Sequence, residues 1–319
     1  MKILVTGAAG FIGSQLAERL VSAGHEVIGV DNMLNNYSVR IKESNIDSVI
    51  QAGCDFVVCD LAQDSLESVL VDVDVVYHCA AQPGLSDLVD LSDFVTNNVI
   101  ATDKLLRAMI DCRGLSSNLI YISTSSVYGS KAVGAESSET KPTSYYGVTK
   151  LAAEHLVMAA TRQERIKACA LRLFSVYGPR ERPEKLYPKV IDSILNDNEF
   201  TLYQGSEKHY RSYTYVDDVL EGMMLVLDNL DICNGEVINI GSDVSVTTKK
   251  GINIVENILG VKAKIITIPQ RSGDQLETKA DIKKAKQLLG YQSKTSIQDG
   301  LVKEIEWYQN VAMRTRRNY

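Results

Sequence analysis

Residues 2–13 read KILVTGAAGFIG, and this stretch decides the fold. A short apolar and β-branched run, typical of a buried parallel strand, leads into Gly7, Gly10 and Gly13. Apolar residues at helical spacing follow, and this helix is expected to end near Gly24. Strand, glycine turn and helix in this order predict an α/β protein with a Rossmann-type doubly wound parallel sheet.

The glycine turn is suited to a dinucleotide. Gly7 permits the tight turn, Gly10 lets the backbone approach a pyrophosphate, and Gly13 lets the helix pack closely on the strand. The helix N-terminus favours the negative charge of the pyrophosphate. Phe11 and Ile12, which lie within the turn, are assigned to the same cofactor site.

The second and third predicted strands each end near an acidic residue. The strand EVIGVD ends at Asp31, 18 residues after Gly13. A carboxylate there accepts hydrogen bonds from ribose hydroxyls and repels a 2′-phosphate, which predicts NAD rather than NADP. Asn32 follows it, and the third strand is expected to end at Asp60, before Leu61. These three residues are assigned to the cofactor site. Asp60 is either an adenine contact or a helix N-cap.

Composition excludes several classes of protein. The chain of 319 residues has 45% hydrophobic and 23% charged residues, which is ordinary for a soluble globular protein. Its net charge of −6 gives no basic surface for nucleic acid. No apolar run approaches the roughly 18 residues of a membrane helix, and no export signal is evident, so we expect a cytoplasmic protein. The six cysteines and four histidines are scattered, which predicts reduced thiols and no metal site.

Small and hydroxyl side chains follow the fourth and fifth predicted strands. Ala80 and Ala81 leave room for a cofactor at the strand's carboxyl end, where open α/β sheets bind ligands, and Gln82 after them is assigned to the same cofactor site. Asn98, near the start of the next predicted helix, is assigned to the cofactor site as well. The hydroxyl run 123–126 is interpreted as active-site lining, because other predicted strands end in the same crevice.

The stretch SYYGVTK, residues 144–150, contains a candidate catalytic pair. Tyr146 and Lys150 are four apart on a predicted helix and therefore share a face. A tyrosine with a pKa of about 10 is a poor base, and a nearby ammonium is expected to lower that pKa. This spacing also occurs by chance, but beside a cofactor crevice it predicts an enzyme.

Motifs along nearly the whole chain together resemble the extended short-chain dehydrogenase/reductase superfamily. They are TGAAGFIG, HCAAQ, STSSVYG, YGVTK, RLFSVYGP, YTYVDDV and RSGDQLETKAD. In the members that act on nucleotide sugars, the tyrosine takes a proton from a sugar hydroxyl while a hydride passes to NAD. The resemblance implies that Tyr146 and Lys150 also contact NAD, and that Thr124 hydrogen-bonds the reacting oxygen.

The hydroxyl run 123–126 narrows the choice among the reactions that this group catalyses. The dehydratases of this group resemble TDEVYG, and the decarboxylases that make UDP-xylose usually carry a glutamate before VYG. Here Thr124, Ser125 and Ser126 supply no carboxylate, which leaves 4-epimerisation, with Ser125 and Ser126 as substrate contacts.

The segment RLFSVYGPRERPEK concerns the sugar. It resembles the FFTVYGPRQR of UDP-glucuronate 4-epimerases, which implies that Ser175 and Arg182 contact the sugar carboxylate. Glucose/galactose epimerases typically have Asn at the position of Ser175. The implied reaction is UDP-glucuronate to UDP-galacturonate. Open alternatives are a UDP-glucose or UDP-N-acetylglucosamine 4-epimerase, a non-catalytic NAD(H)-sensing protein, and a role for Arg180 and Arg182 as solvated loop charges only.

The resemblance also implies contacts to the UDP group. Arg211 takes the position that holds the diphosphate, although Ser212 follows where the family usually has Asp. Arg271 is implied as a phosphate contact and Asp274 as a ribose contact.

Two expectations concern organisation. Residues 1–173 are expected to form the NAD-binding domain and 174–319 mainly a UDP-sugar-binding lobe, with strands near 213–216 and 236–240 returning to the first sheet. Family members commonly pair through two helices of each subunit, here about 94–112 and 146–162, so a homodimer is expected.

Overall fold

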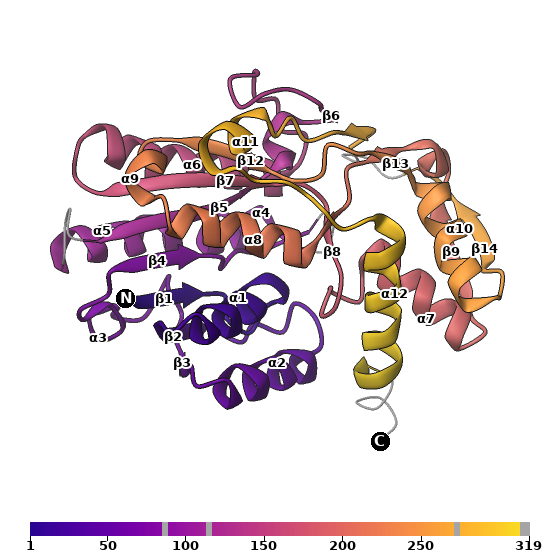
Figure 1. Cartoon of the computed structure of the whole chain (residues 1–319), viewed down its shortest axis with the longest axis horizontal. Coiled ribbons are helices and arrows are strands. Elements are labelled where there is room, and N and C mark those ends of the chain that lie inside the picture. The colour runs from indigo at the N-terminus through magenta and orange to yellow at the C-terminus, as the bar shows by residue number, and fades with distance from the viewer. Residues whose placement is uncertain (85–88, 113–116, 271–274, 313–319) are drawn as a thin grey trace.

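The computed structural model describes residues 1–84, 89–112, 117–270 and 275–312 (Figure 1). In this described part, a seven-stranded parallel sheet has the order β12-β7-β5-β4-β1-β2-β3. Its strands are β1 (Lys2–Thr6), β2 (Glu26–Asp31), β3 (Asp55–Val58), β4 (Val75–His78), β5 (Asn118–Thr124), β7 (Lys167–Leu173) and β12 (Val237–Ile240). The order reverses beside β1, since β2 lies on one side of it and β4 on the other, and this leaves a crevice at the strands' carboxyl ends. The predicted Rossmann-type fold is confirmed.

Helices cover both faces of this sheet. Because side chains alternate along a strand, Ile3 and Val5 enter one core while Leu4 enters the other. The first core contains α1 (Phe11–Ser22), α2 (Val39–Gln51) and α8 (Val216–Leu227). The second contains α3 (Glu67–Leu70), α5 (Ala101–Cys112) and α6 (Tyr145–Arg162).

Two boundaries differ from those predicted. The helix expected to start near Asn98 belongs to a longer helical segment, formed by α4 (Leu91–Phe94), the π-helical turn η1 (Val95–Ile100) and α5. Asn98 therefore lies in the π-turn, and such turns often occur at functional sites. Strand β3 ends at Val58, before Asp60, because its pairing with β2 stops at the Asp31–Val58 pair.

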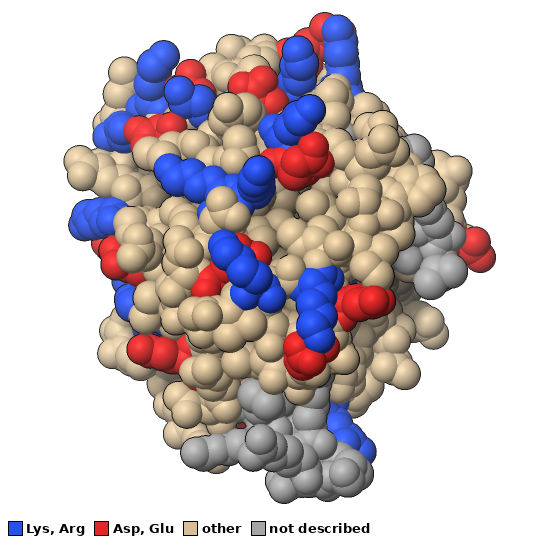
Figure 2. Space-filling model, turned by 90° about the vertical axis from the view of Figure 1, so that its right-hand side faces the viewer, with Lys and Arg blue, Asp and Glu red and all other residues tan. Residues whose placement is uncertain are grey.

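The C-terminal lobe lies beyond the carboxyl ends of the sheet (Figure 1). It contains α7 (Leu186–Leu195), α10 (Thr248–Leu259), α12 (Ile297–Trp307) and the parallel pair β9 (Glu199–Tyr203) and β14 (Lys264–Ile268). Figure 2 shows the outer face of this side of the molecule, where acidic and basic side chains are interspersed. Among the described residues, no helix has the length and apolar character needed to span a membrane.

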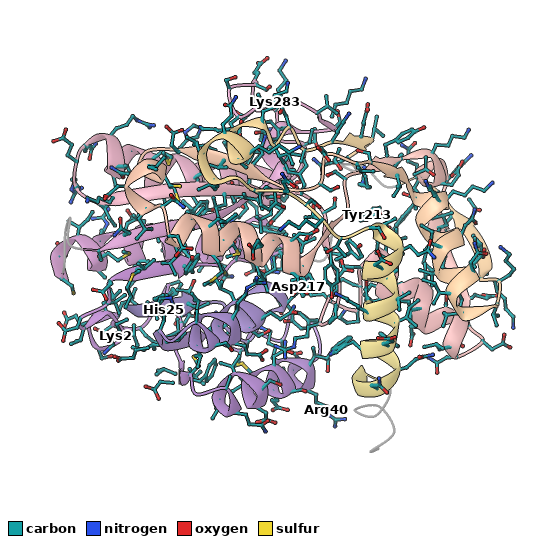
Figure 3. All side chains as sticks on the ribbon, in the orientation of Figure 1. Lys2, His25, Arg40, Tyr213, Asp217 and Lys283 are labelled. Atoms are coloured by element: carbon teal, nitrogen blue, oxygen red, sulfur yellow. The ribbon has the colours of Figure 1, made fainter. Side chains whose placement is uncertain are left out.

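Short strands connect the lobe to the sheet. Residues 237–240 return to the large sheet as β12, but residues 214–215 do not, because β11 (Thr214–Tyr215) pairs with β8 (Val176–Tyr177) outside it. Tyr213, which precedes β11, lies at the junction of sheet and lobe (Figure 3). The remaining elements are α9 (Leu230–Cys233), α11 (Lys283–Leu289), β6 (Lys131–Ala132), β10 (Tyr210–Arg211), β13 (Val246–Thr247), β15 (Glu277–Thr278), η3 (Ser125–Tyr128), η4 (Ser206–Lys208) and η5 (Tyr308–Ala312).

Candidate active site

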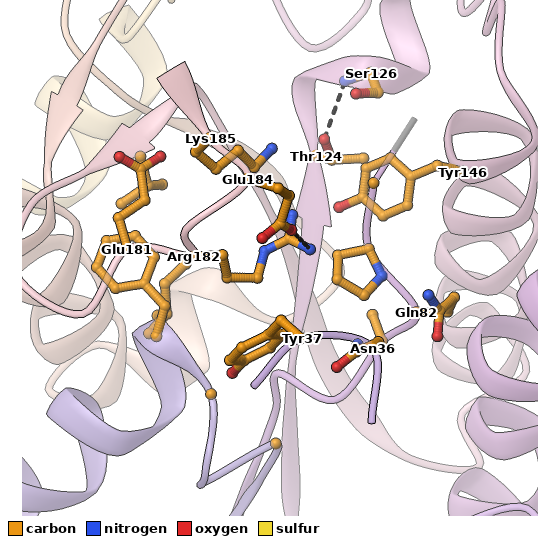
Figure 4. Close-up of a pocket in the computed structure, with 18 of the residues that line it drawn as sticks. Asn36, Tyr37, Gln82, Thr124, Ser126, Tyr146, Glu181, Arg182, Glu184 and Lys185 are labelled. Carbon is orange, nitrogen blue, oxygen red and sulfur yellow. Dashed lines mark hydrogen bonds and ion pairs between the residues drawn. The ribbon is translucent and has the colours of Figure 1, made fainter. Parts of the chain in front are cut away.

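A cavity of about 1400 Å³ lies between the carboxyl ends of the sheet and the C-terminal lobe. Its walls include the glycine turn, the end of β5, the start of α6 and the loop that leads into α7. Figure 4 shows the part where Thr124 and Tyr146 face Arg182. The cavity therefore joins the predicted cofactor residues to the predicted sugar residues.

The glycine turn fits a dinucleotide because nothing larger than hydrogen can occupy two of its positions. A Cβ atom on Gly13 would lie 2.2 Å from the oxygen of Gly7, and one on Gly7 would lie 2.8 Å from the nitrogen of Ala80. Gly7 also has φ +72°, which favours glycine. Helix α1 has Gly10 as its N-cap and no capping side chain, so its first N–H groups are available to an anion. Phe11, Ile12 and Gly13 line the cavity.

Asp31 stands at the cavity where β2 ends. Its carboxylate accepts hydrogen bonds from the nitrogens of Ala9 (3.3 Å) and Met33 (2.9 Å). The Lys42 Nζ atom lies 3.5 Å from it, and the ammonium is 5.2 Å from the ring centroid of Tyr37. The sequence gives no signal for Lys42, because only the packing of α2 brings this buried lysine to the cavity.

Asp60 caps a turn and also lines the cavity. Its Oδ1 accepts a hydrogen bond from the nitrogen of Ala62 at 2.8 Å, so the carboxylate caps the turn after β3. Its Oδ2 lies 3.4 Å from the amide of Asn32. Asn32, Asp60 and Leu61 all line the cavity, so the cap and a cofactor contact are compatible.

Asn98 supports the cavity wall from behind. Ala80, Ala81 and Gln82 line the cavity, whereas Asn98 does not. Its Oδ1 accepts from the Gln82 nitrogen at 2.7 Å, and its amide donates to the Thr149 hydroxyl at 3.0 Å. Both ends of the Asn98 amide are therefore used to hold the wall against α6 instead of facing the cavity.

The three predicted catalytic residues come together. Thr124 ends β5, and Tyr146 lies in the first turn of α6, which Ser144 caps by accepting from the Gly147 nitrogen at 3.1 Å. The Thr124 hydroxyl lies close enough to the Tyr146 phenol to affect its pKa. It also accepts a hydrogen bond from the Ser126 nitrogen at 3.1 Å (Figure 4). This arrangement can hold an alcohol oxygen between two hydroxyl groups.

The electrostatics of the pair differ from the prediction. Burial raises the pKa of Tyr146, although the neighbouring Thr124 hydroxyl and the charge of Arg182 oppose that shift. Burial also lowers the pKa of Lys150 to about 7. The Lys150 ammonium donates to the Ile122 carbonyl at 2.6 Å and lies 4.2 Å from the ring centroid of Tyr121. The expected lowering of the tyrosine pKa is therefore wrong for this structure, because desolvation outweighs the nearby charges.

The two arginines of the loop after β8, Arg180 and Arg182, point in different directions. Arg182 is only 13% exposed, lines the cavity, and pairs through Nη1 with Glu184 Oε1 at 2.6 Å. Arg180 turns away from the sugar side, and its Nη1 lies 2.8 Å from Glu18 Oε1 and 3.1 Å from Ser14 Oγ on α1. Arg182 is therefore a cavity residue and Arg180 a tie between the loop and α1.

Four other predicted substrate residues lie around the same cavity. Ser125, Ser126, Ser175 and Arg211 line it, and Ser175 has φ +29°, a strained backbone of the kind found at functional sites. Ser212, which replaces the usual Asp, is buried and donates to the Ser242 carbonyl. Arg271 and Asp274 lie outside the described residues.

Asn36 and Tyr37 also line the cavity, although no sequence motif indicated them. Both belong to the loop after β2 and face Arg182 across the cavity (Figure 4). Their surroundings carry no motif, because a loop without periodicity does not indicate which of its side chains point inward.

Comparisons with known proteins agree with this geometry. The sequence pattern of the NAD-dependent epimerase/dehydratase family matches residues 3–241. An uncharacterised UDP-glucose epimerase of Bacillus subtilis is 37% identical over 313 residues, covering 96% of this chain and 98% of the relative. UDP-glucuronate 4-epimerase 1 of Arabidopsis thaliana is 32% identical over 97% of this chain and 76% of its own length. The crystal structure of UDP-glucuronic acid 4-epimerase from Bacillus cereus with UDP-glucuronic acid and NAD gives a TM-score of 0.93 at 37% identity, covering 98% of this chain and all 100% of that one.

Proposed function

The chain belongs to the NAD-dependent epimerase/dehydratase family, and from this premise we propose that it interconverts UDP-glucuronate and UDP-galacturonate. It is an isomerase, and NAD is its cofactor. The observation that carries the choice of sugar is the guanidinium of Arg182, only 13% exposed in the cavity and close enough to Tyr146 to affect its pKa. A carboxylate on the sugar is a natural partner for this buried cation.

The side chains of this chain support proton transfer at the sugar's 4-hydroxyl. NAD, when bound, supplies the reversible oxidation at C4. Tyr146 is positioned to exchange a proton with the sugar oxygen, and the Thr124 hydroxyl to hold the same oxygen. Lys150, with a pKa of about 7, can take up or release a proton near neutral pH.

The sugar side must also prevent loss of CO₂. Oxidation of UDP-glucuronate at C4 gives a β-keto acid, whose C–C bond breaks readily when it is perpendicular to the carbonyl plane. A grip by Arg182 and Ser175 that holds this bond near the plane opposes that loss. The hydroxyl strip Thr124, Ser125 and Ser126 contains no carboxylate that could act as the acid of a dehydratase.

A panel of UDP-sugars tests the proposal directly. The purified protein is incubated with UDP-glucuronate, UDP-glucose and UDP-N-acetylglucosamine, and the 4-epimers are followed by NMR. We expect UDP-galacturonate from UDP-glucuronate with no stoichiometric build-up of NADH. A build-up of NADH would instead indicate a net dehydrogenase.

One observation favours a neutral sugar as the second candidate. Glu184 already neutralises Arg182, so the charge of the cavity is balanced without a sugar carboxylate. Preference for UDP-glucose in the same panel would establish this candidate.

A homodimer and a cytoplasmic location are further parts of the proposal. Exposed apolar side chains on the segment 91–112 and the adjacent α6 support pairing through these helices, since Leu91, Ile100 and Val148 are 44%, 47% and 47% exposed. Light scattering at micromolar concentration should give twice the chain mass, and a monomer would refute the pairing. Cell fractionation tests the location.

A further inference from the structure

The Arg182–Glu184 pair lies in a tight turn at the cavity. The Lys185 nitrogen donates to the Arg182 carbonyl at 3.0 Å, which closes a four-residue turn with Pro183 at its second position. The turn brings Arg182 Nη1 within 2.6 Å of Glu184 Oε1, with one residue between them. The pairing is therefore local in the sequence, and both partners lie on the same turn.

The two partners differ in their access to water. The Arg182 side chain is 13% exposed, whereas that of Glu184 is 44% exposed. Figure 4 shows the guanidinium reaching toward Tyr146 and Tyr37, with the Glu184 carboxylate beside it. The Arg182 guanidinium is thus confined to the cavity, while the Glu184 carboxylate can move into solvent at a small cost in free energy.

A substrate carboxylate needs the same guanidinium that Glu184 holds. On the proposed function, the 4-keto sugar must turn over within the cavity, and its carboxylate moves with the ring. Arg182 must then release this carboxylate and bind it again. A guanidinium left unpaired at 13% exposure is unfavourable, because charged groups lose hydration on burial.

We propose that Glu184 is the exchange partner of Arg182, which holds the guanidinium whenever the sugar carboxylate does not. This inference rests on the proposed function and assigns Glu184 a positioning role, because it acts through Arg182. The exchange lowers the affinity for UDP-glucuronate and, in return, lets the keto sugar leave the guanidinium and rotate.

Replacement of the carboxylate by an amide tests the exchange. In Glu184→Gln, Arg182 has no resident anion, so it should hold the substrate carboxylate more tightly in every orientation. We expect the Kd of UDP-glucuronate for the NAD-loaded protein to fall about three- to tenfold and kcat to fall by a similar factor. The Kd of UDP-glucose should not change, because this sugar has no carboxylate.

Two further variants separate this effect from folding and from general electrostatics. Glu184→Asp keeps the anion and should restore most of the parental Kd and kcat. Glu139→Gln removes a surface carboxylate that pairs with Lys141 at 2.7 Å, also with one residue between them, and should change neither constant. Calorimetry measures the Kd values and NMR the turnover.

The outcomes distinguish the inference from the proposed function. A parent protein that does not epimerise UDP-glucuronate refutes the proposed function and the exchange with it. An active parent whose Glu184→Gln variant binds UDP-glucuronate no more tightly, or turns over at least as fast, refutes the exchange alone. Tighter binding of UDP-glucose in the same variant would also refute it, because the gain would not depend on the carboxylate.

Discussion

On the cofactor side of the cavity, the contact surface is backbone and strand ends, whereas on the sugar side it is side chains carried by loops. The glycine turn is held so closely that an added Cβ on Gly13 would lie 2.2 Å from a backbone oxygen. Arg182 and Glu184, in contrast, stand on a turn and meet through flexible side chains.

The same contrast separates two ion pairs. Arg172 of β7 and Glu154 of α6 form a buried ion pair with an N–O distance of 2.5 Å, and their side chains are 5% and 2% exposed. The hydroxyl of Ser123 also donates to Glu154, at 2.6 Å. Arg182 and Glu184 are 13% and 44% exposed. A buried pair is costly to break and fixes the elements it joins, while a half-exposed pair is worth little and can exchange partners. The ion pair Arg172–Glu154 therefore fixes α6, which carries Tyr146, beside the central sheet. The pair Arg182–Glu184 in the loop before α7 can rearrange.

The largest effect is expected at the fixed side, from Tyr146→Phe. Loss of the phenol removes the proton acceptor, so kcat should fall about 10²- to 10⁴-fold while NAD binding is retained. The neighbouring Tyr145, which is 57% exposed, provides the control, and Tyr145→Phe should keep parental turnover. Equal losses in the two variants would show that the effect lies in α6 as a whole and not in the phenol.

The second effect compares the two ion pairs by stability. Glu154→Gln leaves the buried charge of Arg172 without its anion and should lower the free energy of unfolding by about 3 kcal/mol. Glu184→Gln should lower it by less than about 1 kcal/mol. Urea denaturation measures both values. Similar losses in the two variants would remove the proposed difference between the fixed and the exchangeable side.

The third effect concerns the sugar side alone. Arg182→Ala should reduce kcat/KM for UDP-glucuronate about ten- to a hundredfold, since a charge-assisted contact is worth about 1.5–3 kcal/mol. NAD binding should not change, and some CO₂ and a UDP-pentose should appear as the grip on the carboxylate is lost. Arg182→Lys keeps the charge but loses the two-pronged geometry of the guanidinium, so its kcat/KM should lie between those of the parent and of Arg182→Ala. An alanine variant with parental activity would make Arg182 a surface charge and favour the neutral sugar.

The smallest expected effect is a change of stability with pH. It arises where the loop that carries Arg182 packs against α12. Glu181, next to Arg182, and Glu304 of α12 are both buried, and their two carboxyl groups interact with each other. Burial raises the pKa of Glu181 from 4.5 to about 8, and burial beside Glu181 also raises the pKa of Glu304. The folded protein thus keeps a proton that the unfolded chain releases.

Stability from this pair is complete below about pH 4.5 and is lost as the pH rises toward 8. The melting temperature should therefore fall over this range by about 2 °C or more. Glu304→Gln removes one of the two acids and should flatten the profile, as measured by thermal unfolding at a series of pH values. A parental profile in this variant would exclude the pair as its source.

Much of the cofactor side followed from the sequence because its determinants are local. The strand, the glycine turn and α1 are consecutive, and Tyr146 and Lys150 share a face through helical periodicity alone. The hydroxyl run stands at the end of β5, with Thr124 as the last residue of the strand and Ser125 and Ser126 in the following turn η3. Each of these relations involves residues only a few positions apart, so it can be predicted from the sequence alone.

Only the tertiary structure decided the electrostatics and the sugar side. Arg180 and Arg182 are two residues apart in one motif, yet one binds α1 and the other enters the cavity. The pKa of Tyr146 is raised, not lowered, because its desolvation depends on every group packed around it. Glu181 meets Glu304 across more than a hundred residues of chain. Burial and long-range pairing are properties of the folded surroundings as a whole, so no local pattern in the sequence contains them.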